Sequence, residues 1–349
     1  MPVGMSESLY GCFFKLFYKY TKLYVFLVVF LLTFVAMKQD IAIYSAPLQG
    51  FTEAAWRNAH AHVFGGVDAY YTPFVRLEKG EIRNKDRREV SASQNKVEHL
   101  VPQVIASERD EFIQLVRFLQ SEGYQEIDVN MGCPFPMLTK RGKGSGILQH
   151  PDKVAELLAA MNEFPAIAFS VKMRLGYENT NDWQEILPLL NHSCVRQLTL
   201  HPRLGKQQYK GTVDRNSFDS FYALCELPII YNGDLTKLSE IQEIIFSYPR
   251  LKGIMLGRGL LADPSLAQAV KTGTTLDEAT LYAKVGEMHQ LMYQQYEQTI
   301  EGGEAQLLQK MKTMWEYLLP DMGKKARKAI LKSNRLEQYL SNVRAALHF

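Results

Sequence analysis

The sequence predicts a (β/α)8 TIM barrel, an α/β fold, followed by a smaller all-α helical domain. Between residues 41 and 256, eight short apolar segments alternate with stretches of helical length, most of them amphipathic. Alternating strands and helices build parallel sheets, and eight such units spaced roughly 20 to 35 residues apart match a closed barrel. Beyond Pro264 the strand pattern stops and helical periodicity takes over.

The expected elements follow from these periodicities. The strands cover residues 41–45, 67–72, 100–105, 126–130, 167–173, 195–200, 227–231 and 252–256. Helices are expected over residues 109–122, 151–162, 280–298, 305–318 and 324–346, among others. We therefore divide the chain into an N-terminal extension (1–37), a catalytic barrel (38–264) and a helical domain (265–349).

The N-terminal extension contains an apolar, uncharged segment over residues 23–37, preceded by three lysines. This pattern is typical of a signal-peptide core or a short anchor, but 15 residues fall short of the roughly 20 that span a bilayer as a helix. No convincing small-residue cleavage site follows. We favour a third explanation, in which Met37 is the true start, and we expect no membrane attachment.

Composition narrows the class of protein. Four cysteines without a CxxC pair or zinc-ligand spacing exclude a disulfide framework and a structural metal, so we expect a cytoplasmic protein, which we take to be a monomer. The net charge of +3 is uneven, because residues 307–349 contain nine basic and three acidic residues. This excess indicates either a polyanionic partner or a solvated helical face.

Unusual residues gather at the predicted carboxyl ends of the strands, where barrels of this class hold their active sites. In chain order these are Pro47, Leu48, Gln49, Gln103, Asn130, Cys133, Lys172, Arg174, His201, Arg203, Asn232, Gly233, Asp234, Gly257 and Arg258. The turns after the last two strands are glycine-rich, which suits a phosphate site or an ordinary tight turn.

Three of these positions suggest chemistry. Lys172 could stabilise negative charge on a reduced flavin, and Gln103 could hydrogen-bond its pyrimidine edge, although either could be an ordinary polar side chain. Cys133 lies in a Gly-Cys-Pro turn, where its thiol could act as a nucleophile, donate a proton or be an inert buried group.

The segment after Cys133 combines cations with glycines over residues 138–148. Lys140, Arg141 and Lys143 could face a phosphate-rich ligand while the glycines let the backbone approach it. A mobile, solvated loop is the alternative.

Taken in order, these motifs resemble the dihydrouridine synthase family of tRNA-modifying flavoenzymes. The resemblance extends from about residue 41 to the C-terminus. Its most specific elements are the Asn-Met-Gly-Cys-Pro run at 130–134 with the Lys-Arg-Gly-Lys-Gly-Ser-Gly run at 140–146, and the His-Pro-Arg-Leu-Gly-Lys-Gln-Gln-Tyr-Lys-Gly run at 201–211.

The resemblance implies an enzyme that reduces the C5–C6 double bond of a tRNA uridine in the D-loop, with FMN as cofactor, NADPH as reductant and Cys133 as proton donor. FMN would contact Pro47, Leu48, Gln49, Gln103, Lys172, His201, Asn232, Gly233, Asp234, Gly257 and Arg258. The tRNA would contact Asn130, Lys140, Arg141, Arg203, Tyr209 and the helical domain, and no metal is expected.

The chain departs from the family pattern at two places. Pro73 stands where many members carry an acidic residue, and Leu204 replaces the usual threonine after His201 and Arg203. Two other functions remain as alternatives. One is an FMN-dependent oxidoreductase of the dihydroorotate or dihydropyrimidine type, and the other is a non-catalytic RNA-binding protein.

Overall fold

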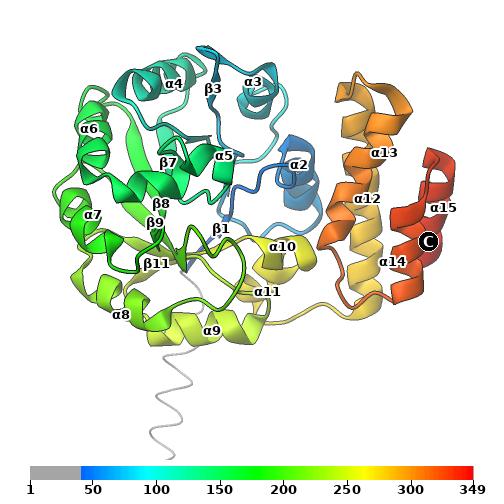
Figure 1. The fold of residues 1–349 in the computed structure, drawn as a ribbon. Coiled ribbons are helices and arrows are strands. Elements are labelled where there is room, and N and C mark those ends of the chain that lie inside the picture. Colours follow the sequence, from blue (N-terminus) through cyan, green and yellow to red (C-terminus); the bar gives the residue numbers. More distant parts are fainter. Residues whose placement is uncertain (1–40, 349) are drawn as a thin grey trace, which may run out of the picture. The chain divides into compact units, whose positions relative to one another are not determined.

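Eight parallel strand positions form a barrel in the computed structural model, which describes residues 41–348 (Figure 1). The apolar segment 23–37 and the expected start at Met37 lie outside the described residues. The barrel strands are β1 (Ala42–Ser45), β2 (Ala69–Tyr71), β5 (Leu100–Val101), β6 (Gln103–Val104), β7 (Glu126–Met131), β8 (Ala168–Gly176), β9 (Gln197–Leu204), β10 (Ile229–Tyr231) and β11 (Leu251–Leu256). The predicted (β/α)8 barrel is thus confirmed.

The third strand position is split into β5 and β6 at Pro102. Proline has no backbone N–H, so the hydrogen-bond ladder is interrupted there. β5 pairs with β2 and β6 pairs with β7, and these two pairings join the ends of the strand row. A short hairpin of β3 (Leu77–Glu78) and β4 (Glu81–Ile82) follows β2 and was not expected from the sequence.

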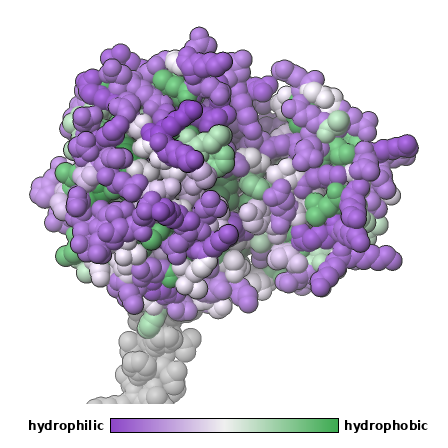
Figure 2. Space-filling model, viewed as in Figure 1, coloured by the Kyte–Doolittle hydropathy of each residue, from purple (hydrophilic) through white to green (hydrophobic). Residues whose placement is uncertain are grey.

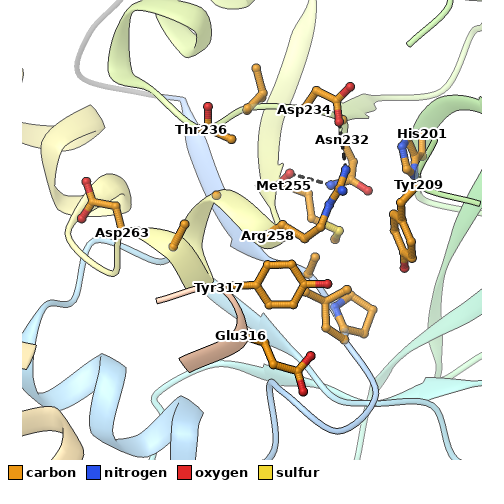
Figure 3. A pocket seen from close by; sticks show the side chains of 18 of the residues that line it. His201, Tyr209, Asn232, Asp234, Thr236, Met255, Arg258, Asp263, Glu316 and Tyr317 are labelled. Atoms are coloured by element: carbon orange, nitrogen blue, oxygen red, sulfur yellow. Dashed lines mark hydrogen bonds and ion pairs between the residues drawn. The ribbon is translucent and has the colours of Figure 1, made fainter. Parts of the chain in front are cut away.

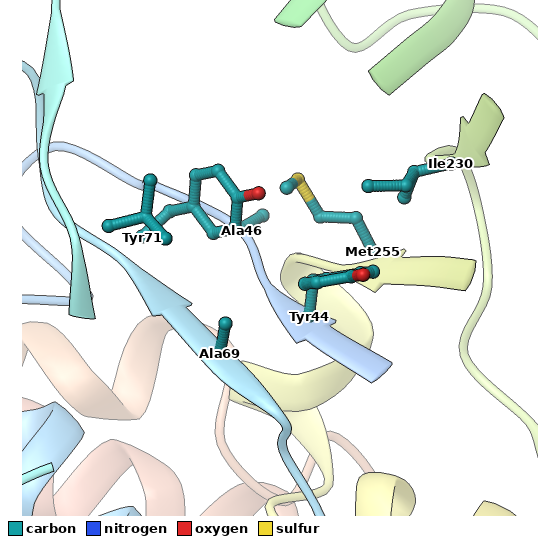
Figure 4. Packing of buried hydrophobic residues seen from close by; sticks show 7 residues of the cluster. Tyr44, Ala46, Ala69, Tyr71, Ile230 and Met255 are labelled. Carbon is teal, nitrogen blue, oxygen red and sulfur yellow. The ribbon is translucent and has the colours of Figure 1, made fainter. Parts of the chain in front are cut away.

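Large and small side chains alternate in the barrel interior, as close packing requires. The cluster contains Tyr44, Ala46, Ala69, Tyr71, Val101, Ile230 and Met255 (Figure 4). The rings of Tyr44 and Tyr71 meet edge to face with centroids 6.0 Å apart. Gly253 leaves space for Tyr44, because a Cβ at this position would lie 2.5 Å from that ring. This filled interior leaves the strand ends as the place for a binding site.

Helices surround the barrel (Figure 1). Those connecting the strands are α2 (Ala54–Val63), α3 (Asn84–Val90), α4 (Arg109–Ser121), α5 (Pro136–Thr139), η1 (Gly144–Gln149), α6 (Pro151–Met161), α7 (Asp182–Asn191), α8 (Arg215–Leu224) and α9 (Leu238–Ser247). After the last strand come α10 (Arg258–Ala262) and α11 (Leu266–Thr272). None of the helices described within residues 41–348 is long and apolar enough to cross a bilayer.

The C-terminal segment is entirely helical and packs beside the barrel. It contains α12 (Glu278–Thr299), α13 (Gly303–Thr313), η2 (Met314–Glu316), α14 (Lys324–Lys332) and α15 (Leu336–Leu347). α12 lies against α2, where Asn58 donates a hydrogen bond to Gln295. Within the segment, the buried Tyr339 hydroxyl accepts from Trp315 and bonds His289 and the Met311 carbonyl.

The single helix expected over residues 324–346 is wrong, because the chain breaks after Lys332. Ser333 has an extended backbone, and its hydroxyl bonds to the Ala329 carbonyl. Serine and asparagine compete with helical hydrogen bonds through their own side chains, which explains a break at Ser333 and Asn334.

Candidate active site

A cavity of about 920 Å³ opens at the carboxyl ends of the barrel strands and reaches the helical segment (Figure 3). Cys133 and Lys172 line it from the barrel, and Glu316 and Tyr317 line it from the helical segment. Its size lies within the range of cofactor pockets. The pocket therefore joins two parts of the chain that are far apart in sequence.

Cys133 is held in a turn by Asn130. The Asn130 side-chain oxygen accepts hydrogen bonds from the backbone N–H groups of Gly132 (3.0 Å) and Cys133 (2.8 Å). Burial raises the pKa of the Cys133 thiol above its usual value, although the Phe135 backbone N–H, Arg174 and Lys172 oppose this. The thiol is therefore protonated at neutral pH.

A row of buried hydrogen bonds supports that turn from below. Asn130 donates to the side-chain oxygen of Gln103 (2.7 Å), and Gln103 in turn donates to Asp128 (2.6 Å). Ser170 donates to the other oxygen of Asp128. Burial raises the pKa of Asp128 to about 6 despite these bonds. Gln103 and Asp128 thus fix the direction of the Asn130 side chain.

The glycine-rich stretch after Cys133 packs against the turn. A Cβ at Gly144 would lie 2.5 Å from the Cys133 carbonyl oxygen, and Gly144 has a φ of +59°. The Ser145 N–H and hydroxyl both donate to that same carbonyl at 3.0 Å. Residues 144–148 are buried. Here the glycines serve close packing, so this part of the loop does not lie free in solvent.

Two cations, the half-buried Lys172 and the buried Arg174, line the pocket from β8. Lys172 donates to the Asn232 side-chain oxygen (2.8 Å), and burial together with Arg174 lowers its pKa to about 8. Arg174 donates to the carbonyls of Gly132 (3.0 Å), Leu204 (2.8 Å) and Gln208 (2.6 Å). Arg174 therefore ties the Cys133 turn to the loop after β9.

His201 is a neutral histidine that lies near Lys172 and Arg174 and among further cations. The Nε2 atom of His201 accepts from Arg203 (3.1 Å), and burial followed by the nearby cations lowers the pKa of His201 well below its usual value. Asp234 accepts hydrogen bonds from Arg203 (2.8 Å) and Arg258 (3.0 Å). The Arg258 guanidinium lies over the ring of Tyr209, 4.7 Å from its centroid.

Positive charge therefore exceeds negative charge on this side of the pocket. Four cations gather here, Lys172, Arg174, Arg203 and Arg258, and the one carboxylate of the described residues that pairs with any of them is the exposed Asp234, which binds Arg203 and Arg258. An uncompensated buried charge is unfavourable, so this wall is suited to an anionic ligand. Apolar side chains complete the lining at Ala46, Leu48, Phe74 and Met255. A planar ring system that carries a phosphate fits this combination of donors and apolar surface.

Most of the predicted site residues meet in this pocket. Its lining includes Pro47, Leu48, Gln49, Asn130, Cys133, Lys172, His201, Tyr209, Asn232, Gly233, Asp234, Gly257 and Arg258. Gln103 and Arg203 lie behind the lining, and Lys140 and Arg141 are exposed outside it. Lys143 pairs with Glu111. The roles predicted for these residues toward FMN and tRNA remain predictions.

The two departures from the family pattern have structural counterparts. Pro73 is buried beside Phe74, whose side chain lines the pocket. Leu204 contributes its backbone instead of a hydroxyl, because its carbonyl accepts from Arg174 and its N–H donates to Gln207.

The cationic excess of the C-terminal segment is partly internal. Lys310 pairs with Glu53, Lys312 donates to the Ser333 carbonyl, and Arg327 donates to the Trp315, Leu318 and Leu319 carbonyls. The remaining six cations are exposed: Lys324, Lys325, Lys328, Lys332, Arg335 and Arg344. The surface seen in Figure 2 is largely hydrophilic over this segment.

Sequence reasoning assigned no role to Asp128, Phe74, Glu316 or Tyr317. Asp128 is inside a strand, where only its polarity in an apolar run marked it. Tyr317 comes from the helical segment and contacts Phe51 edge to face at 5.1 Å. No group of three or more His, Cys, Asp or Glu side chains suited to a metal occurs among residues 41–348.

Comparisons with known proteins agree with this geometry. The family model described as dihydrouridine synthase matches residues 44–348. The tRNA-dihydrouridine synthase B of Pasteurella multocida is 26% identical over 251 residues, which cover 70% of this chain and 73% of that protein. A probable tRNA-dihydrouridine synthase of Staphylococcus epidermidis is 26% identical over 227 residues, 63% of this chain and 68% of that protein.

Among solved structures, histamine dehydrogenase from a Rhizobium species aligns with a TM-score of 0.50 at 13% identity. The alignment covers 70% of this chain, which spans about half of the length of that protein (48%). This likeness concerns the fold alone.

Proposed function

The chain belongs to the dihydrouridine synthase family, and on that premise we propose that it reduces the C5–C6 double bond of a uridine in tRNA. FMN would be its cofactor, NADPH the source of electrons and the D-loop the target region. Family membership favours this activity over a small-molecule oxidoreductase or a non-catalytic RNA-binding protein. The six exposed cations of the helical segment support a polyanionic substrate.

The observation that carries the proposal is the protonated thiol of Cys133 in the wall of the pocket. Reduction of a carbon–carbon double bond adds one hydride and one proton, so the site needs a group that can donate a proton. Cys133 keeps its proton at neutral pH because burial raises its pKa. His201 is neutral, and its Nε2 atom accepts a hydrogen bond from Arg203, so that atom has no proton to donate.

The side of the pocket that contains Lys172, Arg174, Arg203 and Arg258 would hold the cofactor. Pro47, Leu48 and Gln49 would contact the ring system, with Lys172 and His201 nearby, and the phosphate would meet Asn232, Gly233, Asp234, Gly257 and Arg258. Gln103 lies behind the pocket lining and would act on the site through its hydrogen bond with Asn130. When bound, FMN would supply the hydride for C6 of the uracil.

The protein's own contribution is positioning and proton transfer. Asn130 holds the Cys133 turn and would orient the base, while the thiol donates its proton to C5. The S–H bond breaks as the C5–H bond forms, and the resulting thiolate is stabilised by Arg174 and Lys172, both of which lower the pKa of Cys133. Solvent then returns a proton to the thiolate.

A pair of cysteine variants tests this assignment. Cys133→Ala should bind FMN and tRNA like the wild type but form dihydrouridine about 10²- to 10⁴-fold more slowly, the usual contribution of a general acid. Cys194→Ala removes an exposed thiol that does not line the pocket and should retain full activity. Full activity of Cys133→Ala would remove the acid role. A colourless protein that fails to take up FMN would overturn the flavin assignment.

A further inference from the structure

Large apolar side chains are exposed directly after the Cys133 turn. Phe135 is 49% exposed and Met137 is 65% exposed. Phe135 lies two positions after Cys133, the proposed proton donor. Its backbone N–H donates a hydrogen bond to the Cys133 sulfur. Among residues 41–348, the other large hydrophobic side chains that are exposed are Tyr209, Leu224, Phe246 and Leu331. Only Tyr209 of these four lines the pocket.

The backbone holds Phe135 in one conformation. Pro134 precedes it and Pro136 follows it, which restricts the backbone of all three residues. The Phe135 carbonyl accepts hydrogen bonds from the N–H groups of Leu138 (2.9 Å) and Thr139 (3.0 Å). An exposed aromatic ring adds nothing to the hydrophobic core. On a backbone of restricted conformation, however, such a ring binds a flat partner at a lower entropic cost.

Positive charge adjoins this apolar pair. Lys140 and Arg141 are exposed just after α5, and neither forms an ion pair within the described residues. Exposed cations next to an exposed aromatic ring are the combination that binds single-stranded nucleic acid, since phosphates meet the charge and bases stack on the ring. The segment 135–141 is therefore complementary to RNA.

We propose that Phe135, together with Met137, packs against the nucleobase next to the target uridine and replaces the stacking that the uridine loses when it leaves the folded tRNA. A flipped base must give up stacking worth a few kcal/mol, and an apolar side chain at the vacated position offsets this cost. Lys140 and Arg141 would bind the flanking phosphates. This inference rests on the proposed function and names a contact outside the pocket itself.

The first experiment reads the RNA directly and needs no catalysis. tRNA would be bound to Cys133→Ala with and without Phe135→Ala, and the 2′-hydroxyl reactivity of each nucleotide would be mapped by acylation. We expect raised reactivity at the target uridine and its neighbour, and we expect Phe135→Ala to abolish it while protection elsewhere in the tRNA remains. If the reactivity map is the same with and without Phe135→Ala, the inference is overturned, and Phe135 and Met137 serve another partner.

The second experiment measures dihydrouridine formation by the otherwise wild-type enzyme. Phe135→Ala should lower kcat/KM on tRNA about 5- to 150-fold, which is 1–3 kcal/mol of stacking per base converted at about 1.4 kcal/mol per tenfold. Phe135→Trp should restore most of it, because stacking requires an aromatic ring rather than phenylalanine itself. Leu224→Ala removes an apolar side chain on α8 that is even more exposed, at 62%, and should have no effect.

The rate at which NADPH reduces the enzyme distinguishes the proposed function from the stacking role of Phe135. It should proceed at the same rate in Phe135→Ala as in the wild type, since the ring does not line the pocket. If the wild type forms no dihydrouridine, the proposed function fails. If the wild type is active and Phe135→Ala matches it, or Phe135→Trp is as poor as Phe135→Ala, only the stacking role fails.

Discussion

Replacing Lys310 by methionine should destabilise the protein and loosen the loop after β1. Lys310 lies on α13, and its ammonium group contacts the Glu53 carboxylate at 2.5 Å and donates to the Gly50 carbonyl at 2.8 Å. Glu53 is only 5% exposed and also pairs with Lys85 at 2.7 Å. The loop that these interactions fix contains Pro47, Leu48 and Gln49, which line the pocket.

The magnitude follows from burial. Removing one partner of a buried ion pair costs about 3–5 kcal/mol, because the other charge is left in a poorly hydrated place. Lys85 stays on the Glu53 carboxylate, so we expect about 2–3 kcal/mol for Lys310→Met. Lys85→Met is the matched control, since the Lys85 side chain is 52% exposed and such pairs contribute about 1 kcal/mol or less.

Urea denaturation measures both losses of stability, and FMN titration reports on the loop. The double variant Lys310→Met/Glu53→Gln should recover part of the stability, because it no longer buries a carboxylate that has lost one of its two cations. Burial alone would raise the pKa of Glu53, but Lys310 and Lys85 hold it below its usual value. The stabilisation is therefore present above about pH 4.5 and declines as the pH falls further, and Lys310→Met should weaken this decline. Equal destabilisation in Lys310→Met and Lys85→Met, with no recovery in the double variant, would refute the reasoning.

Three further predictions concern the pocket and the helical segment. Because burial raises the pKa of Cys133 above its usual value, dihydrouridine formation in single turnovers should decline only in clearly alkaline solution; a decline near neutral pH would contradict the acid role. Gly144→Ala should reduce activity and stability, the latter by about 1–3 kcal/mol, because its Cβ meets the Cys133 carbonyl; Gly123→Ala, with a φ of +91° and open space, should cost only the backbone strain. Lys328→Glu should weaken tRNA binding and reduce the slope of log K against log salt by about 0.7–0.9 for each phosphate that the protein no longer neutralises, whereas Lys252→Glu on β11 should not.

The barrel could be predicted because its signal is local. Each parallel strand is buried on both sides and appears as a short apolar run, and all eight predicted runs overlap a strand. The break in the third strand also had a local signal in Pro102. The helix break at Ser333 was missed because the apolar periodicity continues across it, from Ile330 to Tyr339.

The positions of the site residues were more predictable than their interactions. The barrel brings all strand ends to one face, so residues such as Cys133 and Lys172 had to meet there. What Gln103 touches depends on strand register, since Gln103 pairs with Asp128 across β6 and β7. In the sequence, the glycines near Gly144 indicate only that the backbone there packs closely against another group. The sequence does not say that this neighbour is Cys133.

The charge of the C-terminal segment illustrates the same limit and leaves one feature that the fold does not explain. Composition could not separate cations with internal partners, such as Lys310, from those on the surface. Among the latter, Lys324, Lys328 and Lys332 are spaced four residues apart and share one face of α14. Like charges at this spacing destabilise a helix, and a lysine in the first turn opposes the helix dipole. Only Lys332, in the last turn, suits the dipole. An anionic partner is therefore the best explanation for Lys324 and Lys328, and Lys328→Glu should stabilise α14 slightly while it weakens tRNA binding.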